Sequence, residues 1–322
     1  MHPARSDGSG PSDACSPVDN LTCYIMLISR RSTLVAPLAV LPLAARAQAA
    51  PPRAVASFSI LQEMAGRIAG DAMQTTALVP RDSDPHAFEP RPGDLATLHG
   101  AGVMVENGLG LEGWLSRMVQ ASGFKGVRVV ASTGIKPRSL QEDGATVADP
   151  HVWQDPALGR QMVQTIAAGL IKADPGNADR YRAAAADYVA ELKRVEDEIV
   201  HELADIPKER RIVLTTHDAF AYYGARFGIR FVAIEGISTE AEPPPRALAR
   251  VAGQAKKDGL RTVFLENMTD PRLAQALARE AHLTVGAKLY SDSLSAIGGP
   301  APTYIDLLRY NTKQLAASMR AV

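Results

Sequence analysis

Short apolar runs alternate with amphipathic stretches along most of the chain, and this alternation predicts βα units around mostly parallel sheets. The pattern occurs twice. In the first half, the expected strands are Ala54 to Phe58, Gln74 to Val79, Gly102 to Val105 and Val127 to Ala131. In the second half, they are Arg211 to Thr215, Arg230 to Ile234, Thr262 to Leu265 and Val285 to Tyr290. The sequence therefore predicts an α/β protein with two lobes.

A segment between the two halves has apolar residues at steps of three and four. These residues are Tyr181, Ala185, Tyr188, Leu192, Val195, Ile199 and Leu203. The spacing predicts one apolar stripe on a helix from Asn177 to Leu203, with Asn177 as its N-cap. At 1.5 Å per residue, this helix would be roughly 40 Å long and could connect both lobes rigidly. The alternative is a surface helix that packs on one lobe only.

The chain is expected to divide into a leader, two lobes and the helix that connects them. The leader comprises residues 1–49: residues 1–25 are an extension before a start at Met26, and residues 26–49 are a signal peptide. The N-terminal lobe comprises residues 50–175, the connecting helix 176–206 and the C-terminal lobe 207–322. A positively charged segment, an apolar stretch and small residues precede an expected cleavage after Ala49. The apolar stretch is shorter than the roughly 20 residues that span a membrane, so export is predicted. Arg30 and Arg31 leave a twin-arginine export route open.

Composition narrows the function classes. The 35 basic residues balance the 35 acidic ones, so no basic field favours nucleic acid. Both cysteines, Cys15 and Cys23, lie in the expected leader, so the mature chain should have no disulfide, thiolate ligand or lipid-bearing cysteine. The stretch from Thr133 to Pro150 is expected to be an irregular, mobile loop.

Three histidines and one aspartate at separate positions form a complete ligand set for a divalent metal such as zinc. They are His86, His151, His217 and Asp292. His86, His217 and Asp292 follow expected strands, and ligands of open α/β sheets bind outside the carboxyl ends of strands. His151 precedes a helix expected to begin near Pro156. With two ligands from each half, we expect the metal site between the lobes.

Other residues near these four have expected supporting roles. Asp84, Asp149 and Asp218 lie one or two residues from a histidine and are candidates to orient the imidazoles. Helix capping or turn formation is an equally good role for each of them. Trp153 is expected to pack in the core.

Several motifs around these residues resemble the zinc and manganese substrate-binding proteins of bacterial ABC uptake systems (the cluster A-I binding proteins). They are Asp84-Pro85-His86, Asp149 through Pro156 (DPHVWQDP), Thr216 through Phe220 (THDAF), Glu235 through Ser238 (EGIS) and Tyr304-Ile305-Asp306. The resemblance extends from about Ala54 to Met319. It implies a periplasmic monomer that binds a metal through His86, His151, His217 and Asp292. The implied partners are an ABC permease and its ATPase, while a metallochaperone is a partner that the sequence leaves open.

The residue at position 217 bears on the choice of metal. Manganese-importing relatives commonly have glutamate there, and the harder manganese ion prefers oxygen ligands. Three imidazoles therefore favour zinc, although mixed nitrogen and oxygen sites also accept manganese and iron. Many zinc-binding relatives have a long histidine-rich loop before the second ligand, whereas this chain has only the acids Glu142, Asp143 and Asp149 there. Protons should compete with the metal as the pH falls through about 6.5.

A binding protein is expected rather than an enzyme, because four protein ligands leave no position for a reactive water. The rival hypothesis is a secreted zinc hydrolase that uses the three histidines, with Asp292 or a glutamate as general base instead of a ligand. The chain has no His-Glu-x-x-His motif, which counts against this hypothesis. A receptor for a chelated metal or cobalamin would leave the four-residue pattern unexplained.

Overall fold

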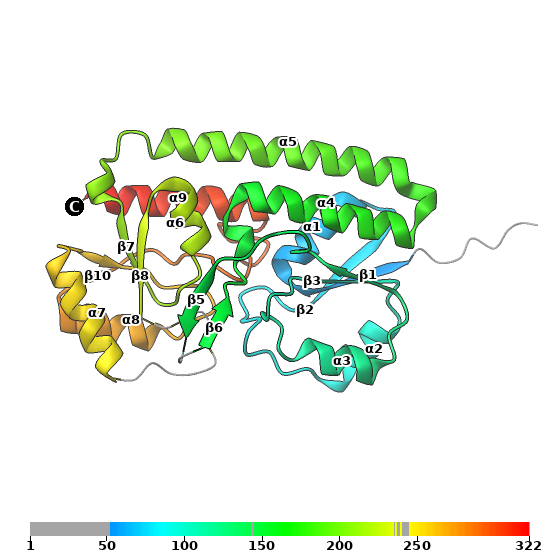
Figure 1. Cartoon of the computed structure of the whole chain (residues 1–322), viewed down its shortest axis with the longest axis horizontal. Coiled ribbons are helices and arrows are strands. Elements are labelled where there is room, and N and C mark those ends of the chain that lie inside the picture. The colour runs from blue at the N-terminus through cyan, green and yellow to red at the C-terminus, as the bar shows by residue number, and fades with distance from the viewer. Residues whose placement is uncertain (1–51, 143–144, 235, 237–238, 240–244, 322) are drawn as a thin grey trace, which may run out of the picture. The chain divides into compact units, whose positions relative to one another are not determined.

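The computed structural model describes residues 52–142, 145–234, 236, 239 and 245–321, which belong to one compact unit, Ala49–Val322 (Figure 1). The expected leader, with its start at Met26 and its cleavage after Ala49, lies outside the described residues. In the described part, no helix combines the length and the apolar character needed to cross a membrane.

The first half of the unit forms a parallel sheet with the strand order β2-β1-β3-β4. Its strands are β1 (Arg53–Phe58), β2 (Gln74–Val79), β3 (Val103–Glu106) and β4 (Val127–Val130). Helices α1 (Ser59–Ala69), α2 (Pro92–His99) and α3 (Leu115–Ser122) connect them. Parallel neighbours need such crossover connections. All four strands were predicted, with each boundary within one residue.

The second half forms another parallel sheet, with the order β10-β9-β7-β8. Its strands are β7 (Ile212–Thr215), β8 (Arg230–Ala233), β9 (Thr262–Val263) and β10 (Thr284–Val285). The connecting helices are α6 (Ala221–Phe227), α7 (Pro245–Lys257) and α8 (Pro271–Ala281), and α9 (Tyr304–Arg320) ends the fold. The two α/β lobes predicted from the sequence are confirmed.

Strands β9 and β10 are shorter than predicted because their pairing is interrupted. Val263 pairs with Val285, and the next bridge joins Glu266 to Leu289. Between these two pairs the chain advances by three residues on the β9 side and by four on the β10 side. One extra residue on one strand is the definition of a β-bulge. The bulge ends the regular strands before the predicted Leu265 and Tyr290.

The predicted connecting helix is α5 (Ala178–Glu202), and its apolar stripe is buried as expected. It packs against α4 (Pro156–Ala173) and α1 from the first half, and against α9 at the other end (Figure 1). The helix thus joins both lobes, and the alternative of a helix on one lobe is wrong. Asn177 precedes the helix as predicted, but its side chain donates to Asp174 and makes no capping bond.

The predicted irregular loop from Thr133 to Pro150 instead contains a β-hairpin. Strands β5 (Ser139–Glu142) and β6 (Ala145–Ala148) pair antiparallel. Residues 143–144, between the two strands, lie outside the described residues. Short 3₁₀ helices, η1 (Val152–Gln154), η2 (Pro175–Asn177) and η3 (Lys208–Arg210), complete the described elements.

Buried apolar side chains in the described chain form a larger and a smaller cluster. The larger one contains the first sheet, α5, α9 and part of the second half, including Phe220, Tyr223 and Leu294. The smaller one lies where α7 and α8 cover the second sheet, around Val251, Val263 and Leu277. The continuous larger core supports one side of the region between the lobes, where the site lies.

Candidate metal centre

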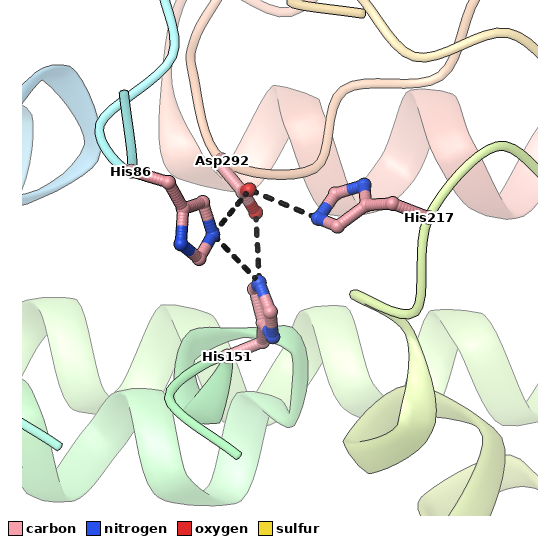
Figure 2. A group of neighbouring side chains, drawn as sticks. All are labelled: His86, His151, His217 and Asp292. Carbon is pink, nitrogen blue, oxygen red and sulfur yellow. Dashed lines mark hydrogen bonds and ion pairs between the residues drawn. The ribbon is translucent and has the colours of Figure 1, made fainter. Parts of the chain in front are cut away.

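The four predicted residues converge on one buried point between the lobes (Figure 2). Asp292 Oδ2 lies 3.4 Å from His86 Nε2 and 3.2 Å from His217 Nε2, and Asp292 Oδ1 lies 3.6 Å from His151 Nε2. The Nε2 atoms of His86 and His151 are 3.4 Å apart. Ligands at 2.0–2.1 Å from a tetrahedral zinc ion are about 3.3–3.4 Å from one another. These four separations are close to that value, and one ligand atom from each residue lies within 4.8 Å of the others, so the cluster is compact enough to hold one small divalent ion.

Each of the four side chains comes from a different segment. His86 lies in the loop after β2, and His217 follows β7. Asp292 lies three residues after Leu289, which forms the bridge with Glu266 beyond the end of β10. His151 immediately precedes η1, ahead of the N-terminus of α4. Two side chains come from each half, as predicted, because the carboxyl ends of both parallel sheets face the region between the lobes.

Asp149 orients His151, as the sequence suggested. Its Oδ1 accepts hydrogen bonds from the backbone N–H of His151 at 3.0 Å and from Nδ1 at 2.8 Å. A carboxylate can only accept, so Nδ1 carries a proton, and Nε2, which faces Asp292, is the nitrogen that must lose its proton when a metal binds. The same aspartate thus fixes both the backbone and the ring of His151.

Glu266 lies behind His217 and bonds its backbone, while its contact with the ring is a short ion-pair contact and not a hydrogen bond; sequence reasoning missed this residue. Its Oε2 lies 2.5 Å from Nδ1 of His217, while its Oε1 accepts from the backbone N–H of His217 at 3.0 Å and from Thr216 Oγ1 at 2.9 Å. The prediction for Asp218 was wrong, since its side chain forms no hydrogen bond or ion pair with any of the three imidazoles. The available signal was position, because Glu266 follows β9, the neighbour of β7.

Asp84 shapes the turn before His86 instead of orienting its ring. Asp84 Oδ1 accepts from the backbone N–H of His86 at 2.8 Å, and Oδ2 accepts from the hydroxyl of Thr239. Within the described residues, no side chain bonds Nδ1 of His86. The expected role in turn formation, not the expected role in ring orientation, is therefore confirmed for Asp84.

Trp153 and Gln154 tie together the segments that carry His151 and Asp292. Trp153 Nε1 and Gln154 Nε2 both donate to the carbonyl of Ser291, each at 2.8 Å. Trp153 is fully buried and packs against Phe58. It is a core residue, as expected, and it also fixes the backbone beside Asp292.

A second set of bonds ties the loop of His86 to the loop that follows Asp292. Arg81 Nη1 donates to the carbonyls of Ser295 and Pro302, each at 2.8 Å. Asp82 Oδ2 accepts from the backbone N–H of Ala296 at 3.0 Å. We call Arg81 and Asp82 the loop clasp, because they hold two site loops from different halves together.

The electrostatics of the cluster suit a cation. Burial alone would raise the pKa of Asp292, but the positive charges of His151 and His217 hold it well below its usual range. Burial alone would lower the pKa of His151, but Asp292 and Asp149 raise it to about 9. For His217, Glu266 and Asp292 likewise overcome burial and raise the pKa well above its usual value. A metal that binds here must therefore displace protons.

Buried polar atoms at the same point lack hydrogen-bond partners. Those that face the other site residues are Oδ1 and Oδ2 of Asp292 and Nε2 of His217, and Nδ1 of His217 and Oε2 of Glu266 behind them also lack a hydrogen bond. Such orphaned atoms are costly in a protein interior, and coordination to one cation would satisfy the three that face the cluster. The donor set of three imidazole nitrogens and one carboxylate fits zinc and also admits manganese or iron.

Two parallel-sheet lobes, a joining helix and a buried three-histidine, one-aspartate cluster define a metal-binding protein of the ABC solute-binding class. Residues 54–318 match the family described as zinc-uptake complex component A, periplasmic (ZnuA), and the chain belongs to this family. Its members are non-enzymatic substrate-binding components of ABC metal-uptake systems, so the hydrolase hypothesis is wrong.

The proteins that this chain resembles are named for different metals, namely manganese, iron and zinc. The chain is 31% identical to the manganese-binding lipoprotein MntA of Halalkalibacterium halodurans over 82% of this chain and 87% of that one. It is 28% identical to the iron-binding protein YfeA of Yersinia pestis, over 82% and 85%. A Mn-bound periplasmic metal-binding protein from Candidatus Liberibacter asiaticus has a TM-score of 0.75 at 25% identity, over 83% and 99%. The fold also matches the periplasmic zinc-binding protein TroA of Treponema pallidum, with a TM-score of 0.80 at 24% identity, over 84% and 99%.

Proposed function

We propose that this protein captures Zn²⁺ outside the cytoplasm with His86, His151, His217 and Asp292 and delivers it to an ABC permease and its ATPase. The observation that carries the proposal is the convergence of three Nε2 atoms on the two oxygens of one carboxylate, at 3.2 to 3.6 Å. Nitrogen-rich tetrahedral sites suit zinc, whereas manganese prefers oxygen ligands and higher coordination.

The alternative is a manganese- or iron-binding protein of the same family. It is favoured by the names of relatives such as MntA and YfeA, which bind those metals. Against it stands His217, a nitrogen donor that Glu266 fixes in place. Supply in the cell can override raw affinity, so the metal must be measured in competition.

Metal content provides the direct test. Protein exported from cells and purified without added metal should contain about one equivalent of zinc, and excess manganese should not displace it. The variant His151→Ala should retain the circular dichroism of the wild type while losing tight zinc binding. A purified protein that carries manganese or iron, and exchanges zinc for it readily, would establish the alternative.

The remaining parts of the proposal concern the chain's organisation. We propose that residues 26–49 are a cleaved signal peptide, with a start at Met26, and that the mature protein is a monomer in the periplasm. The proposed lobes comprise residues 50–175 and 207–322, with 176–206 as the connecting helix. N-terminal sequencing of the exported protein tests the cleavage site, since any first residue other than Ala50 contradicts it.

A further inference from the structure

We infer that Tyr222 and Arg226 of α6 are positioning residues that hold the two lobes together around the site and so limit how fast a bound ion leaves. We call this pair the α6 bracket. Neither side chain lies among the four converging residues. The inference rests on the proposed function, because it assumes that an ion binds at the cluster and is later released from it.

Helix α6 lies where the two halves of the chain meet. It begins four residues after His217 and packs against η1, the short helix that directly follows His151. Tyr222 and Arg226 are four positions apart, so they project from the same face of α6, one turn from each other. Both side chains contact segments of the first half, on either side of His151.

Tyr222 bonds the chain just before His151. Its buried hydroxyl donates to the carbonyl of Asp149 at 2.9 Å and accepts from the backbone N–H of Arg138, also at 2.9 Å. Asp149 and Arg138 bond each other at the base of the β5–β6 hairpin, through the N–H of Asp149 and the carbonyl of Arg138. The tyrosine therefore links α6 to both ends of this hairpin.

Arg226 contacts the chain just after His151. Its Nη2 pairs with Oε1 of Glu196, which is buried on α5, and its Nε lies 3.8 Å from Oδ1 of Asp155. Asp155 is the N-cap of α4 and accepts a backbone N–H from the first turn of that helix. Arg226 thus links α6 to the connecting helix and to the start of the helix that follows His151.

These contacts bear on release because the cluster is enclosed. Its four side chains are at most 6% exposed, so an ion bound by both halves leaves when the halves move apart. That movement must break the hydrogen bond of Tyr222 and the ion pairs of Arg226. A variant without them keeps every ligand but opens at a lower cost in free energy. We therefore expect the α6 bracket to affect dissociation of the metal more than its association.

Arg160 provides a matched control. Arg160 and Arg226 pair with the two oxygens of the same buried carboxylate, Glu196, but Arg160 comes from α4 in the first half. Replacing either arginine with glutamine leaves Glu196 with one arginine. Only Arg226→Gln removes a contact that comes from the second half. A difference between the two variants therefore reports the link between the lobes and not the pairing of Glu196.

The experiment measures the rates at which the full chain and its variants bind zinc and lose it to excess chelator. We expect Arg226→Gln to release zinc about tenfold faster than the wild type, which corresponds to one lost hydrogen bond to a charged group. Tyr222→Phe should release it about threefold faster, which corresponds to one neutral hydrogen bond. We expect a change below about twofold for Arg160→Gln, and association rates within about twofold of the wild type throughout.

The distance between the lobes provides a second readout. Helices α3 and α8 lie in different lobes (Figure 1) and carry the exposed residues Gln120 and Glu280. Spin labels on Gln120→Cys and Glu280→Cys, in a chain whose two native cysteines are changed to serine, report the separation of the lobes. In the metal-free protein, we expect Arg226→Gln to add a population at longer distance that Arg160→Gln lacks.

Contrary results are defined for both readouts. Equal dissociation rates in Arg226→Gln and Arg160→Gln would overturn the inference, and so would faster release without any change in the distance between the lobes. Thermal unfolding of each metal-free variant shows whether it folds. Tyr222→Phe removes a single hydroxyl and no charge, so it keeps the test decisive if Arg226→Gln is unstable.

The same measurements separate this inference from the proposed function. A wild-type chain that binds no zinc would refute the proposed function itself. Zinc that the wild type binds, and that all variants release at the wild-type rate, would refute only the role of the α6 bracket.

Discussion

The three site imidazoles differ in what holds their second ring nitrogen. Asp149 holds that of His151 and Glu266 holds that of His217, whereas no described side chain holds that of His86. Since a carboxylate on Nδ1 strengthens Nε2 as a ligand, two of the three histidines are prepared for metal. His86 depends instead on its backbone, which Asp84 fixes.

These partners make zinc binding depend on pH above neutrality. Asp292 and Asp149 raise the pKa of His151 to about 9, so its ring is positively charged at pH 7 in the metal-free protein, and Glu266 and Asp292 raise the pKa of His217 in the same direction. Zinc must displace the proton on Nε2 of His151, so its affinity should keep rising with pH between 7 and 9. The sequence alone suggested a rise complete near pH 6.5. Zinc titrations at pH 6, 7 and 8 check this, and equal affinities at all three would contradict it.

A buried carboxyl away from the cluster should give the fold its own pH dependence. Burial raises the pKa of Glu112 to about 7, although Ser57, Asn107 and Gly108 donate hydrogen bonds to it. Its folded pKa exceeds its unfolded value, so its contribution to stability is present below about pH 4.5 and is lost as the pH rises through 7. The loss is on the order of 3 kcal/mol.

The variant Glu112→Gln tests this dependence. Relative to the wild type, its free energy of unfolding should fall less between pH 5 and pH 7.5, because the amide does not ionise. Urea unfolding of both metal-free proteins at the two pH values gives the change in the free energy of unfolding for each. The contributions of other titrating groups cancel when the two changes are compared. Parallel losses in the two proteins would show that Glu112 does not titrate in this range.

At the scale of elements, regular patterns predicted well and long-range geometry did not. Strand β2 was predicted residue for residue, because its apolar run and its bounding turns are local signals. The bulge that shortens β9 and β10 depends on how two distant segments align, which no local pattern contains. Glu266 escaped prediction for the same reason, since it lies 49 residues from His217 in sequence. The β5–β6 hairpin was missed although its two strands are close neighbours in sequence.

The loop clasp should determine how well two of the site loops are held before metal binds. Arg81→Ala removes both hydrogen bonds to the carbonyls of Ser295 and Pro302. Because these are bonds from a charged donor, we expect the free energy of unfolding to fall by about 2 kcal/mol. Zinc affinity should fall about tenfold, since the loop of His86 must then be ordered on binding.

Arg182→Ala is the matched control for the clasp. Arg182 pairs with Asp179 on the exposed face of α5, where its side chain is 61% exposed. An exposed pair of this kind is worth less than about 0.5 kcal/mol, and it contacts no site loop. Urea unfolding and zinc titration of both variants test this prediction. If Arg81→Ala and Arg182→Ala change the free energy of unfolding and the zinc affinity equally, the loop clasp does not hold the site loops.

At the scale of the whole molecule, the cluster joins segments from both lobes across a rigid helix. A bound ion would add a link among four segments that the fold already holds close, so binding should stabilise the folded state without large rearrangement. At free zinc 100-fold above the dissociation constant, the stabilisation is about 2.7 kcal/mol, which raises the melting temperature by about 5 to 10 °C. The variant His151→Ala should show almost no shift in melting temperature.

At equal free concentration, manganese should raise the melting temperature less than zinc does, because three of the four donors are imidazole nitrogens. A manganese shift that equals or exceeds the zinc shift would favour the manganese alternative, and a shift retained in His151→Ala would mean that zinc binds elsewhere.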